Sequence, residues 1–341
     1  MPTLSSNEIY SRQILFRGIG EEGQQKLQNS RVAIVGCGAT GSVIASLLAR
    51  AGVGFLRIID RDYVEPSNLQ RQILFDEDDA AKFIPKAVAA AKRLSACNSN
   101  VKVESQVADL TPHNVESLLA DCTLIMDGTD NFETRYLIND FAIAKNIPWI
   151  YTAAIGSIGV TMNILPGETA CMACMFPDSP NGAMETCETF GILNAAVAGI
   201  GASASSEALK FLTGAKALMR RTLLTEDVWW TDRAELPAEA QRADCRCCVR
   251  REFTHLSGEN RPHIALCGSN SVQIHEKTRT IDLAELEQRL LPHGTVRCNG
   301  FALRFWRGPY QLTIFPDGRA IIKGTTDVGV ARSLYARFLG A

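Results

Sequence analysis

The stretch RVAIVGCGATG, residues 31–41, constrains the fold of this chain more than any other part of the sequence. It joins an apolar run, typical of a buried strand, to glycines Gly36, Gly38 and Gly41. Such a loop between a strand and a helix lets backbone N–H groups approach a phosphate. Asp60 ends the next apolar run, FLRIID, where a carboxylate can hold a ribose hydroxyl. These features predict an adenine-nucleotide site, but they do not separate NAD from ATP.

Strand-like and helix-like segments alternate from residue 31 to about residue 165. Runs such as RVAIV, FLRII, VKVESQ, CTLIMD and IPWIY are interspersed with helix-like segments at 40–52, 86–97 and 133–145. The alternation predicts an α/β fold, with a Rossmann-like, mainly parallel sheet that has helices on both faces.

A polar linker, REFTHLSGENRPH, follows Cys248 and precedes a different pattern of short strands with a helix in DLAELEQRLL and another at 327–339. We therefore predict an ATP-binding domain over residues 1–255 and a small α+β domain over residues 262–341. The role of the second domain is left open: it could dock a protein substrate or stabilise a dimer.

Composition excludes several classes of protein. A net charge of −2 over 341 residues, with no basic run, gives no reason to expect nucleic-acid binding. The start MPTLSSNEIYSRQ lacks the apolar core of a signal peptide, and the small-residue stretch from 191 to 214 carries charged residues, which indicates a buried helix and no membrane span. Eleven cysteines in such a chain favour reduced thiols in the cytoplasm and a metal site.

Charged residues beyond Asp60 favour ATP over NAD. Two cations and two carboxylates near one nucleotide suit a triphosphate with Mg²⁺ better than a nicotinamide. The sequence shows no obvious His or Tyr–Lys arrangement of the kind that transfers a proton alongside a hydride. The polar residues concerned follow the second strand and the later CTLIMD strand: Asp62, Asn68, Arg71, Gln72, Lys86, Asp127, Asp130, Asn131 and Arg135.

Two cysteine groups, CMAC and CRCC, lie far apart in the sequence. Cys171 and Cys174 form one CxxC pair, and Cys245 with Cys248 forms the other; we favour Cys248 over Cys247 because CxxC geometry suits one metal better than CxC. Four thiolates can bind a tetrahedral Zn²⁺. The predicted site is structural, because it has no open coordination position.

Several motifs in order resemble the MoeB/ThiF/HesA family, bacterial relatives of the ubiquitin-activating enzymes. The resemblance covers about residues 8–250 and includes YSRQILFRGIGEEGQQKLQNSRVAIVGCGATG, DRDYVEPSNLQRQ, IPK, DGTDN and both cysteine groups. Ala39 departs from it, since the family commonly has a further glycine there, and the spacer before Lys86 is slightly longer.

The resemblance implies ATP-dependent adenylation of the C-terminal glycine of a ubiquitin-like sulfur carrier of the ThiS or MoaD type, with a cysteine desulfurase as sulfur donor. It implies that Asp60 binds the ribose, that the glycine loop with Ala39 contacts the nucleotide and that Asp130 holds Mg²⁺. The phosphates would be held by Asn68, Arg71 and Lys86. Arg12 would reach the active site of the other subunit of a homodimer.

Cys187 lies in NGAMETCETFGIL, a polar loop before a helix. A helix N-terminus can lower the pKa of a thiol, whereas the adjacent Glu185 and Glu188 have the opposite effect. In the family a cysteine here can form an acyl disulfide with the carrier. The alternative is a simple loop cysteine.

The implied chemistry needs no general base, because an α-carboxylate with a pKa of about 3.5 is already ionised at neutral pH. Cations and Mg²⁺ would offset the repulsion between this anion and the nucleotide, while in-line positioning accelerates the reaction. Two alternatives stay open: adenylation of another carboxylate, such as a peptide C-terminus or a tRNA-linked substrate, and a nucleotide-binding scaffold without turnover.

Overall fold

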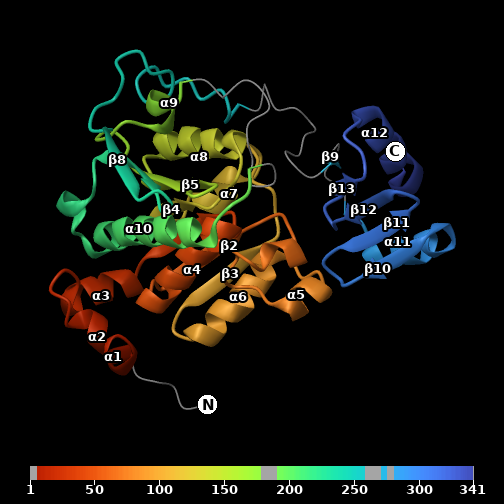
Figure 1. The fold of residues 1–341 in the computed structure, drawn as a ribbon, viewed down its shortest axis with the longest axis horizontal. Helices are drawn as coiled ribbons and strands as arrows, with labels where there is room; N and C mark the ends of the chain where they lie inside the picture. The colour runs from red at the N-terminus through yellow and green to blue at the C-terminus, as the bar shows by residue number, and fades with distance from the viewer. Residues whose placement is uncertain (1–5, 178–189, 258–269, 275–279, 341) are drawn as a thin grey trace. The chain divides into compact units, whose positions relative to one another are not determined.

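The computed structural model describes residues 6–177, 190–257, 270–274 and 280–340. These residues form two compact units, each built around its own β-sheet (Figure 1). The domain boundary that the sequence predicts between residues 255 and 262 enters a stretch outside the described residues, so it stays a prediction. No helix in the described ranges is long and apolar enough to cross a membrane.

The first unit contains an eight-stranded sheet with the order β3-β2-β1-β4-β5-β6-β7-β8. Strands β3, β2, β1, β4 and β5 are parallel, whereas β6, β7 and β8 continue the sheet antiparallel. The predicted mainly parallel α/β sheet is confirmed. Its strands are β1 (Arg31–Val35), β2 (Phe55–Ile59), β3 (Lys102–Gln106), β4 (Leu124–Asp127), β5 (Trp149–Ile155), β6 (Ile158–Ile164), β7 (Thr222–Asp227) and β8 (Asp232–Pro237).

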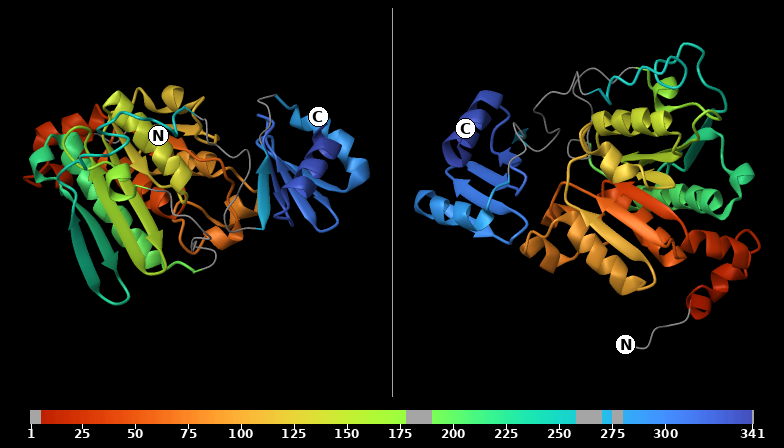
Figure 2. Two further views of the ribbon diagram at one scale, coloured as in Figure 1. Left: turned by 90° about the horizontal axis from the view of Figure 1, so that it is seen from above. Right: turned by 180° about the vertical axis from the view of Figure 1, so that it is seen from behind.

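Helices cover both faces of this sheet (Figure 2). Successive residues of β1 alternate between two cores: Val32 and Ile34 pack with α4, α6 and α10, whereas Ala33 and Val35 pack with α7 and α8. A strand buried on both faces reads as an unbroken apolar run. The helices of this unit are α1 (Ser6–Ile9), α2 (Ser11–Ile14), α3 (Gly20–Gln28), α4 (Ala39–Ala51), α5 (Glu77–Ala81), α6 (Lys86–Cys97), α7 (Val115–Leu119), α8 (Phe132–Lys145), α9 (Met172–Met175) and α10 (Asn194–Thr213).

The second unit contains a five-stranded antiparallel sheet with the order β10-β11-β12-β13-β9. Leucines of α11 and aromatic residues of α12 form its core with one face of the sheet. Aspartates cap both helices, because the Asp282 and Asp327 carboxylates accept backbone N–H groups of the first turn. The elements are β9 (Ser271–Ile274), α11 (Leu283–Leu290), β10 (Thr295–Cys298), β11 (Leu303–Arg307), β12 (Tyr310–Ile314), β13 (Ala320–Lys323) and α12 (Val328–Leu339).

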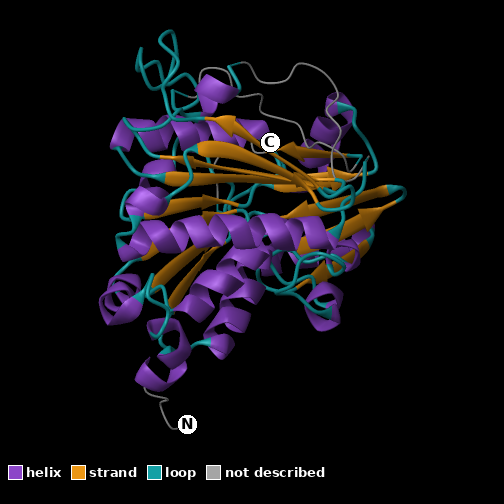
Figure 3. Ribbon diagram, turned by 60° about the vertical axis from the view of Figure 1, so that its left-hand side comes forward, coloured by secondary structure: helices purple, strands orange, loops and turns teal. Residues whose placement is uncertain are grey.

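The long helix α10 lies along the sheet of the first unit and packs against α4, the helix that follows the glycine loop (Figure 3). The two helices are in close contact at Gly201, because a Cβ added there would lie 2.9 Å from Val43 Cγ1. Gly199, two residues earlier, has far more room: its Cβ would meet only Val228 Cγ1, at 4.0 Å. The position of α4 therefore depends on a missing side chain at Gly201.

We predict opposite effects for alanine at these two positions of α10. Gly201→Ala should lower the free energy of unfolding by roughly 1–3 kcal/mol, because it overpacks the contact with Val43. Gly199→Ala should leave stability unchanged or raise it by up to about 1 kcal/mol, since alanine favours a helix. Urea unfolding of both variants measures the difference. Equal destabilisation of the two would contradict the packing described here.

Candidate active site and metal centre

The carboxyl ends of β1, β2 and β4 meet at one edge of the sheet, because these strands are parallel neighbours. The glycine loop follows β1, and the turn Asp127–Asn131 follows β4. A Cβ on Gly41 would lie 2.0 Å from Gly36 O, and one on Gly128 would lie 2.3 Å from the same oxygen. Side chains are therefore excluded where the loop and the turn touch.

The start of α4 opens at this loop. Gly38 is the N-cap of the helix, and Ala39 is its first residue. The first backbone N–H groups of a helix have no partner within it, so they are available to an anion. Gln72 is buried close by: its Nε2 lies 3.8 Å from the position that a Cβ of Gly38 would take.

Asp60, at the end of β2, ties the glycine loop to the next strand. Its Oδ2 accepts the N–H of Cys37 at 2.6 Å, and its Oδ1 accepts the N–H of Asp62 at 2.7 Å. Burial raises the pKa of the Asp60 carboxyl, and the nearby Lys86 ammonium opposes that rise. Each carboxylate oxygen keeps a second lone pair, so Asp60 can also accept a ribose hydroxyl.

Lys86 is the first residue of α6 and is buried. Its Nζ lies 3.3 Å from Asp62 Oδ2, and its backbone N–H donates to the Asp62 carbonyl. Burial opposes the charge of Lys86, but the carboxylates of Asp62 and Asp60 outweigh burial and raise its pKa. The Lys86 ammonium is thus held protonated close to the carboxyl end of β2.

The structure adds two residues that the sequence did not single out. Arg61 Nη1 lies 3.3 Å from Asp109 Oδ1, and its Nε lies 3.9 Å from Asp62 Oδ1. Burial opposes the charge of Arg61, whereas Asp62 and Asp109 raise its pKa. The sequence offered one signal for Arg61, its position directly after Asp60. It offered none for Asp109, which lies in a loop after β3.

Asn68 and Arg71 lie in the loop after β2. Asn68 is buried, and its Oδ1 accepts the N–H of Glu65 at 3.1 Å, so it helps to shape the short 3₁₀ helix Pro66–Asn68. Arg71 is partly exposed, and its Nη1 donates to the Ser67 carbonyl at 2.8 Å. Arg71 therefore presents its charge at the surface of this loop.

The Asp127 side chain faces the interior of the protein. It is fully buried, and donors already occupy both carboxylate oxygens: Thr129 at Oδ1 through its N–H and hydroxyl, and Arg135 and the N–H of Thr152 at Oδ2. The sequence had counted Asp127 with the nucleotide residues, because a strand end is where such carboxylates lie. Because internal donors already occupy both of its carboxylate oxygens, Asp127 supports the turn from within the protein.

Asp130, in contrast, is exposed at the tip of the same turn. The next residue, Asn131, starts α8: its Oδ1 accepts the N–H of Thr134 at 2.9 Å as the N-cap of the helix. The turn therefore offers one exposed carboxylate, that of Asp130, at the edge where the carboxyl ends of β1, β2 and β4 meet.

Arg12 lies far from the glycine loop of its own chain. It is exposed on α2, and the side chain of the next residue, Gln13, donates to the carbonyl of Ala51 at 2.8 Å. Ala51 is the last residue of α4, whose first turn is at the glycine loop. With a rise of about 1.5 Å per residue, α4 separates the two ends by roughly 20 Å.

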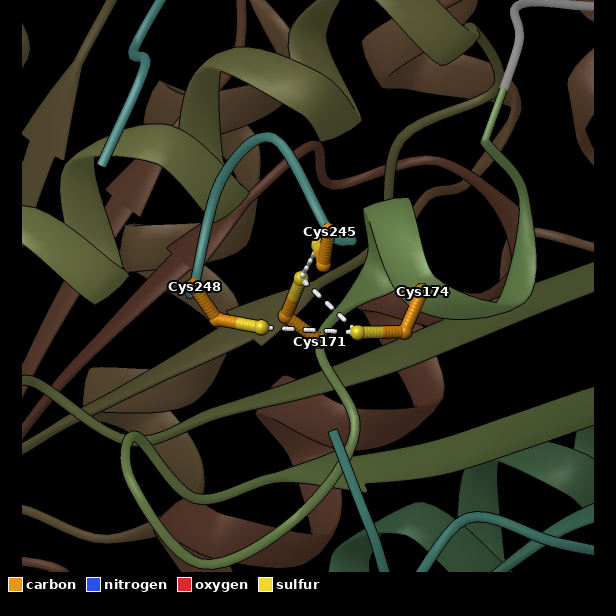
Figure 4. A group of neighbouring side chains, drawn as sticks. All are labelled: Cys171, Cys174, Cys245 and Cys248. Atoms are coloured by element: carbon orange, nitrogen blue, oxygen red, sulfur yellow. Dashed lines mark hydrogen bonds between the residues drawn. The ribbon is translucent and has the colours of Figure 1, made fainter. Parts of the chain in front are cut away.

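Four cysteine sulfurs converge from the two sequence-distant groups (Figure 4). The Sγ atoms of Cys171, Cys174, Cys245 and Cys248 all lie within 4.8 Å of one another. Three of the six separations are 3.8 Å for Cys171–Cys174, 3.6 Å for Cys171–Cys245 and 3.4 Å for Cys174–Cys248. This cluster can hold a metal ion between the start of α9 and the 245–248 loop.

Helix α8 supports both halves of this cluster. Asn139 is fully buried; its Oδ1 accepts the N–H of Met172, and its Nδ2 donates to Cys247 Sγ at 3.2 Å. Asp140, also fully buried, accepts Arg246 Nη1 at 3.3 Å and the N–H of His255 at 3.0 Å. Cys247 is thus bonded to Asn139 and stands outside the four-sulfur group.

A sequence profile described as the ThiF family matches residues 10–247. The chain belongs to the ThiF family. The sulfur carrier protein ThiS adenylyltransferase of Bacillus subtilis (strain 168) is 42% identical over 97% of this chain and 99% of that protein. The sulfur carrier protein adenylyltransferase of Thermus thermophilus is 37% identical over 77% of this chain and 92% of that protein.

The fold of a solved structure agrees with this membership. E. coli MccB, crystallised with MccA-N7isoASN, superposes with a TM-score of 0.64 over 72% of this chain and 75% of that chain, at 22% identity. The family profile and the two bacterial relatives confirm the resemblance to the MoeB/ThiF/HesA family. Of the ThiF-family residues predicted here, Cys187 lies outside the described residues.

We predict that Asn139 controls how firmly this ThiF-family chain retains a metal ion bound at the cysteine cluster. Asn139→Leu removes the amide that bonds to the N–H of Met172 and to the sulfur of Cys247, which are chain neighbours of cluster cysteines. We expect metal loss to a chelator to become about 10–100 times faster. Time-resolved metal release in the presence of a chromogenic chelator measures the rate.

Asn98→Leu is the matched control. Asn98 is also buried, and its Nδ2 bonds to Tyr10 Oη and the Ala49 carbonyl, away from the cysteines. It should lower stability without accelerating metal release. Equal acceleration in both variants would show that general loosening of the fold, and not Asn139, governs the metal.

Proposed function

We propose that this chain uses ATP to adenylate the C-terminal glycine of a ubiquitin-like sulfur carrier protein. The observation that carries the proposal is the match, over nearly full length, to a ThiS adenylyltransferase, whose 42% identity spans 99% of that protein. The arrangement at the sheet edge supports it. A glycine loop, the Asp60 carboxylate and the exposed Asp130 follow three adjacent strands of one sheet, and the charged Lys86 begins helix α6. The product feeds sulfur incorporation into thiamin, molybdopterin or a related compound.

The reaction is a displacement at the α-phosphate. A carboxylate oxygen of the carrier's terminal glycine forms a bond to the α-phosphorus, the bond from that phosphorus to the bridging oxygen breaks, and pyrophosphate leaves. No proton is transferred, because the carboxylate is ionised. The enzyme must therefore bring two anions together, so fixed positive charge and positioning account for the acceleration.

In this proposal the chain's own residues act as follows. Asp60 and the glycine loop bind the ribose and phosphates, with Asp62, Gln72 and Asn131 around them. Lys86, Arg71 and Asn68 hold the phosphates and stabilise charge on the departing pyrophosphate. Asp130 would hold Mg²⁺, which supplies further charge neutralisation when bound. The exposure of the Asp130 carboxylate supports that assignment.

We propose Zn²⁺ as the metal of the cysteine cluster. In a tetrahedron with Zn–S bonds of about 2.3 Å, the sulfurs lie about 3.8 Å apart. Three of the six separations, 3.8, 3.6 and 3.4 Å, are close to that value, and all six are within 4.8 Å. Four thiolates fill the coordination sphere, so such a zinc fastens the chain and takes no part in catalysis.

We also propose that the enzyme is a homodimer in which Arg12 completes the partner's active site. Arg12 is next to Gln13, which bonds to the end of α4 that lies roughly 20 Å along the helix from the glycine loop, and this argues against a role in the same chain. Leu15 and Phe16, next to α2, are 72% and 65% exposed. Apolar side chains this exposed are typical of a surface that a second protein covers.

Other parts of the proposal rest on the family resemblance. Cys187 is proposed as the site of an acyl disulfide with the carrier, with sulfur supplied by a cysteine desulfurase. The 262–341 domain is a candidate for docking the carrier or stabilising the dimer. Free cysteines throughout the described residues favour a reducing compartment such as the cytoplasm.

We predict that the protein forms a carrier acyl-adenylate from ATP and a ThiS- or MoaD-type carrier. Mass spectrometry should detect the carrier with added AMP, and ATP–pyrophosphate exchange should depend on the carrier. Asp130→Ala should reduce exchange by at least about 100-fold, because charge stabilisation is lost. Asp78→Ala, at an exposed aspartate of α5, is the control and should exchange at the wild-type rate. Wild-type exchange by Asp130→Ala would refute the assignment, and absence of an acyl-adenylate with every carrier would refute the function.

We predict that two inactive variants restore each other when their subunits mix. In a dimer of Arg12→Ala and Asp130→Ala chains, one site keeps its own Asp130 and receives Arg12 from the partner. Random 1:1 mixing should therefore return about a quarter of wild-type exchange activity. Denaturing and refolding the two variants together, against each refolded alone, provides the measurement. No recovery in confirmed mixed dimers would mean that Arg12 does not act across the interface.

A further inference from the structure

Asp127 and Arg135 form a buried ion pair beneath the turn that carries Asp130. The Asp127 side chain is 0% exposed and that of Arg135 is 6% exposed. Arg135 Nε donates to Asp127 Oδ2 at 3.0 Å, and its Nη2 donates to the carbonyls of Thr129 at 2.5 Å and Thr152 at 3.3 Å. One guanidinium therefore joins the end of β4, the turn and β5.

The Asp127 carboxylate fixes the same turn from the other side. Thr129 donates to Asp127 Oδ1 through its N–H at 2.8 Å and through its hydroxyl at 2.7 Å. Gly128, between them, lies against the glycine loop with no room for a Cβ. Residues 127–129 are thus fixed to the strand ends and to the loop, and Asp130 is the first residue of the turn that is well exposed.

Stability alone does not account for this pair. Burial opposes the charge of Arg135, whereas Asp127 raises its pKa, so the guanidinium stays charged in an apolar setting beside the rings of Phe132 and Tyr151. Apolar residues of similar volume often replace a buried ion pair without loss of stability. What they cannot replace is a directional link from one side chain to a carboxylate and two carbonyls.

We propose that Arg135 and Asp127 are a positioning pair that sets the Thr129–Asp130 turn against the glycine loop, so that Asp130 and the loop bind one Mg–nucleotide complex together. Neither residue touches the nucleotide. The inference rests on the proposed function, since it takes Asp130 as the metal ligand. Loss of the pair leaves the contacts of the glycine loop intact and displaces the metal ligand, so binding of the metal complex weakens more than binding of the metal-free nucleotide.

The test compares binding of the α,β-methylene analogue of ATP with and without Mg²⁺ by titration calorimetry. Arg135→Lys keeps the charge but cannot donate to the carboxylate and both carbonyls at once. Asp127→Asn/Arg135→Gln removes both charges, which avoids a lone buried ion. In each, we expect the affinity for the Mg²⁺ complex to fall about tenfold or more and that for the metal-free analogue to change by less than about twofold.

Arg57→Gln is the matched control. Arg57 is a buried arginine of the same sheet, bonded to Glu104, Asp121 and the carbonyl of Leu118, and these bonds involve neither the glycine loop nor the turn after β4. The substitution should lower stability without separating the two affinities. Carrier-dependent exchange at varied Mg²⁺ gives a second readout, in which only the Arg135 and Asp127 variants need more Mg²⁺ for half-maximal rate.

Three results would overturn the inference: unchanged affinities in folded Arg135→Lys, an equal fall of both affinities, or the same separation in Arg57→Gln. An equal fall would assign the pair to the fold in general. Failure of the proposed function is recognised separately. A wild-type protein that binds the Mg²⁺ complex but adenylates no carrier would refute the function, while the binding comparison still decides the role of the pair.

Discussion

The close backbone contact between the glycine loop and the turn after β4 is the constraint on which the rest of the site depends. Gly36, Gly41 and Gly128 meet where a single Cβ would lie 2.0–2.6 Å from backbone atoms. Because the three positions exclude side chains, strands β1 and β4 can bring the glycine loop and the turn after β4 together at one edge of the sheet. The hydrogen bonds of Asp60 to Cys37 and Asp62 extend the same arrangement to β2. The residues that we propose to bind the nucleotide, which follow three separate strands, are thereby brought to one edge of the sheet.

Helix α8 connects this edge to the cysteine cluster. Its first turn carries Arg135, which bonds to the turn after β4. One turn later it carries Asn139, which bonds to Met172 and Cys247, the chain neighbours of cluster cysteines. Residues four apart lie on one face of a helix, so a single face serves both sites. A metal bound by Cys171 and Cys245 would therefore also hold α8, the helix that begins directly after the Asp130 turn. The zinc that we propose at this cluster would thus influence the proposed active site through the fold, with no role in the chemistry.

The sequence predicted those features that arise from local patterns. Helices α4, α6 and α8 lie within one residue of the predicted segments, and the two CxxC pairs converge as their spacing indicated. Features that depend on the third dimension were missed. Asp127 has the same strand-end position as Asp60, and only the side chains of Arg135 and Thr129 show that it faces inward. Strand β8 was not predicted because all its residues are exposed, so it lacks the apolar alternation that marks a half-buried strand. Asp109 and Arg61 are far apart in the sequence. They come together because β3, which precedes Asp109, lies next to β2, which precedes Arg61, in the sheet.

The charges of Lys86 and Asp62 explain how the proposed site can keep its positive charge before the nucleotide binds and then bind that highly charged ligand. Lys86 is buried and would be costly to keep charged alone, and Asp62 at 3.3 Å keeps it protonated before any phosphate arrives. Asp62 is more exposed than Lys86, with 39% of its side chain accessible against 10%. The carboxylate can therefore return to water when a triphosphate takes over the ammonium, while the lysine stays in place. Positive charge is thus positioned in advance and needs no rearrangement when the nucleotide binds, which is the condition under which fixed charges accelerate a reaction between two anions most.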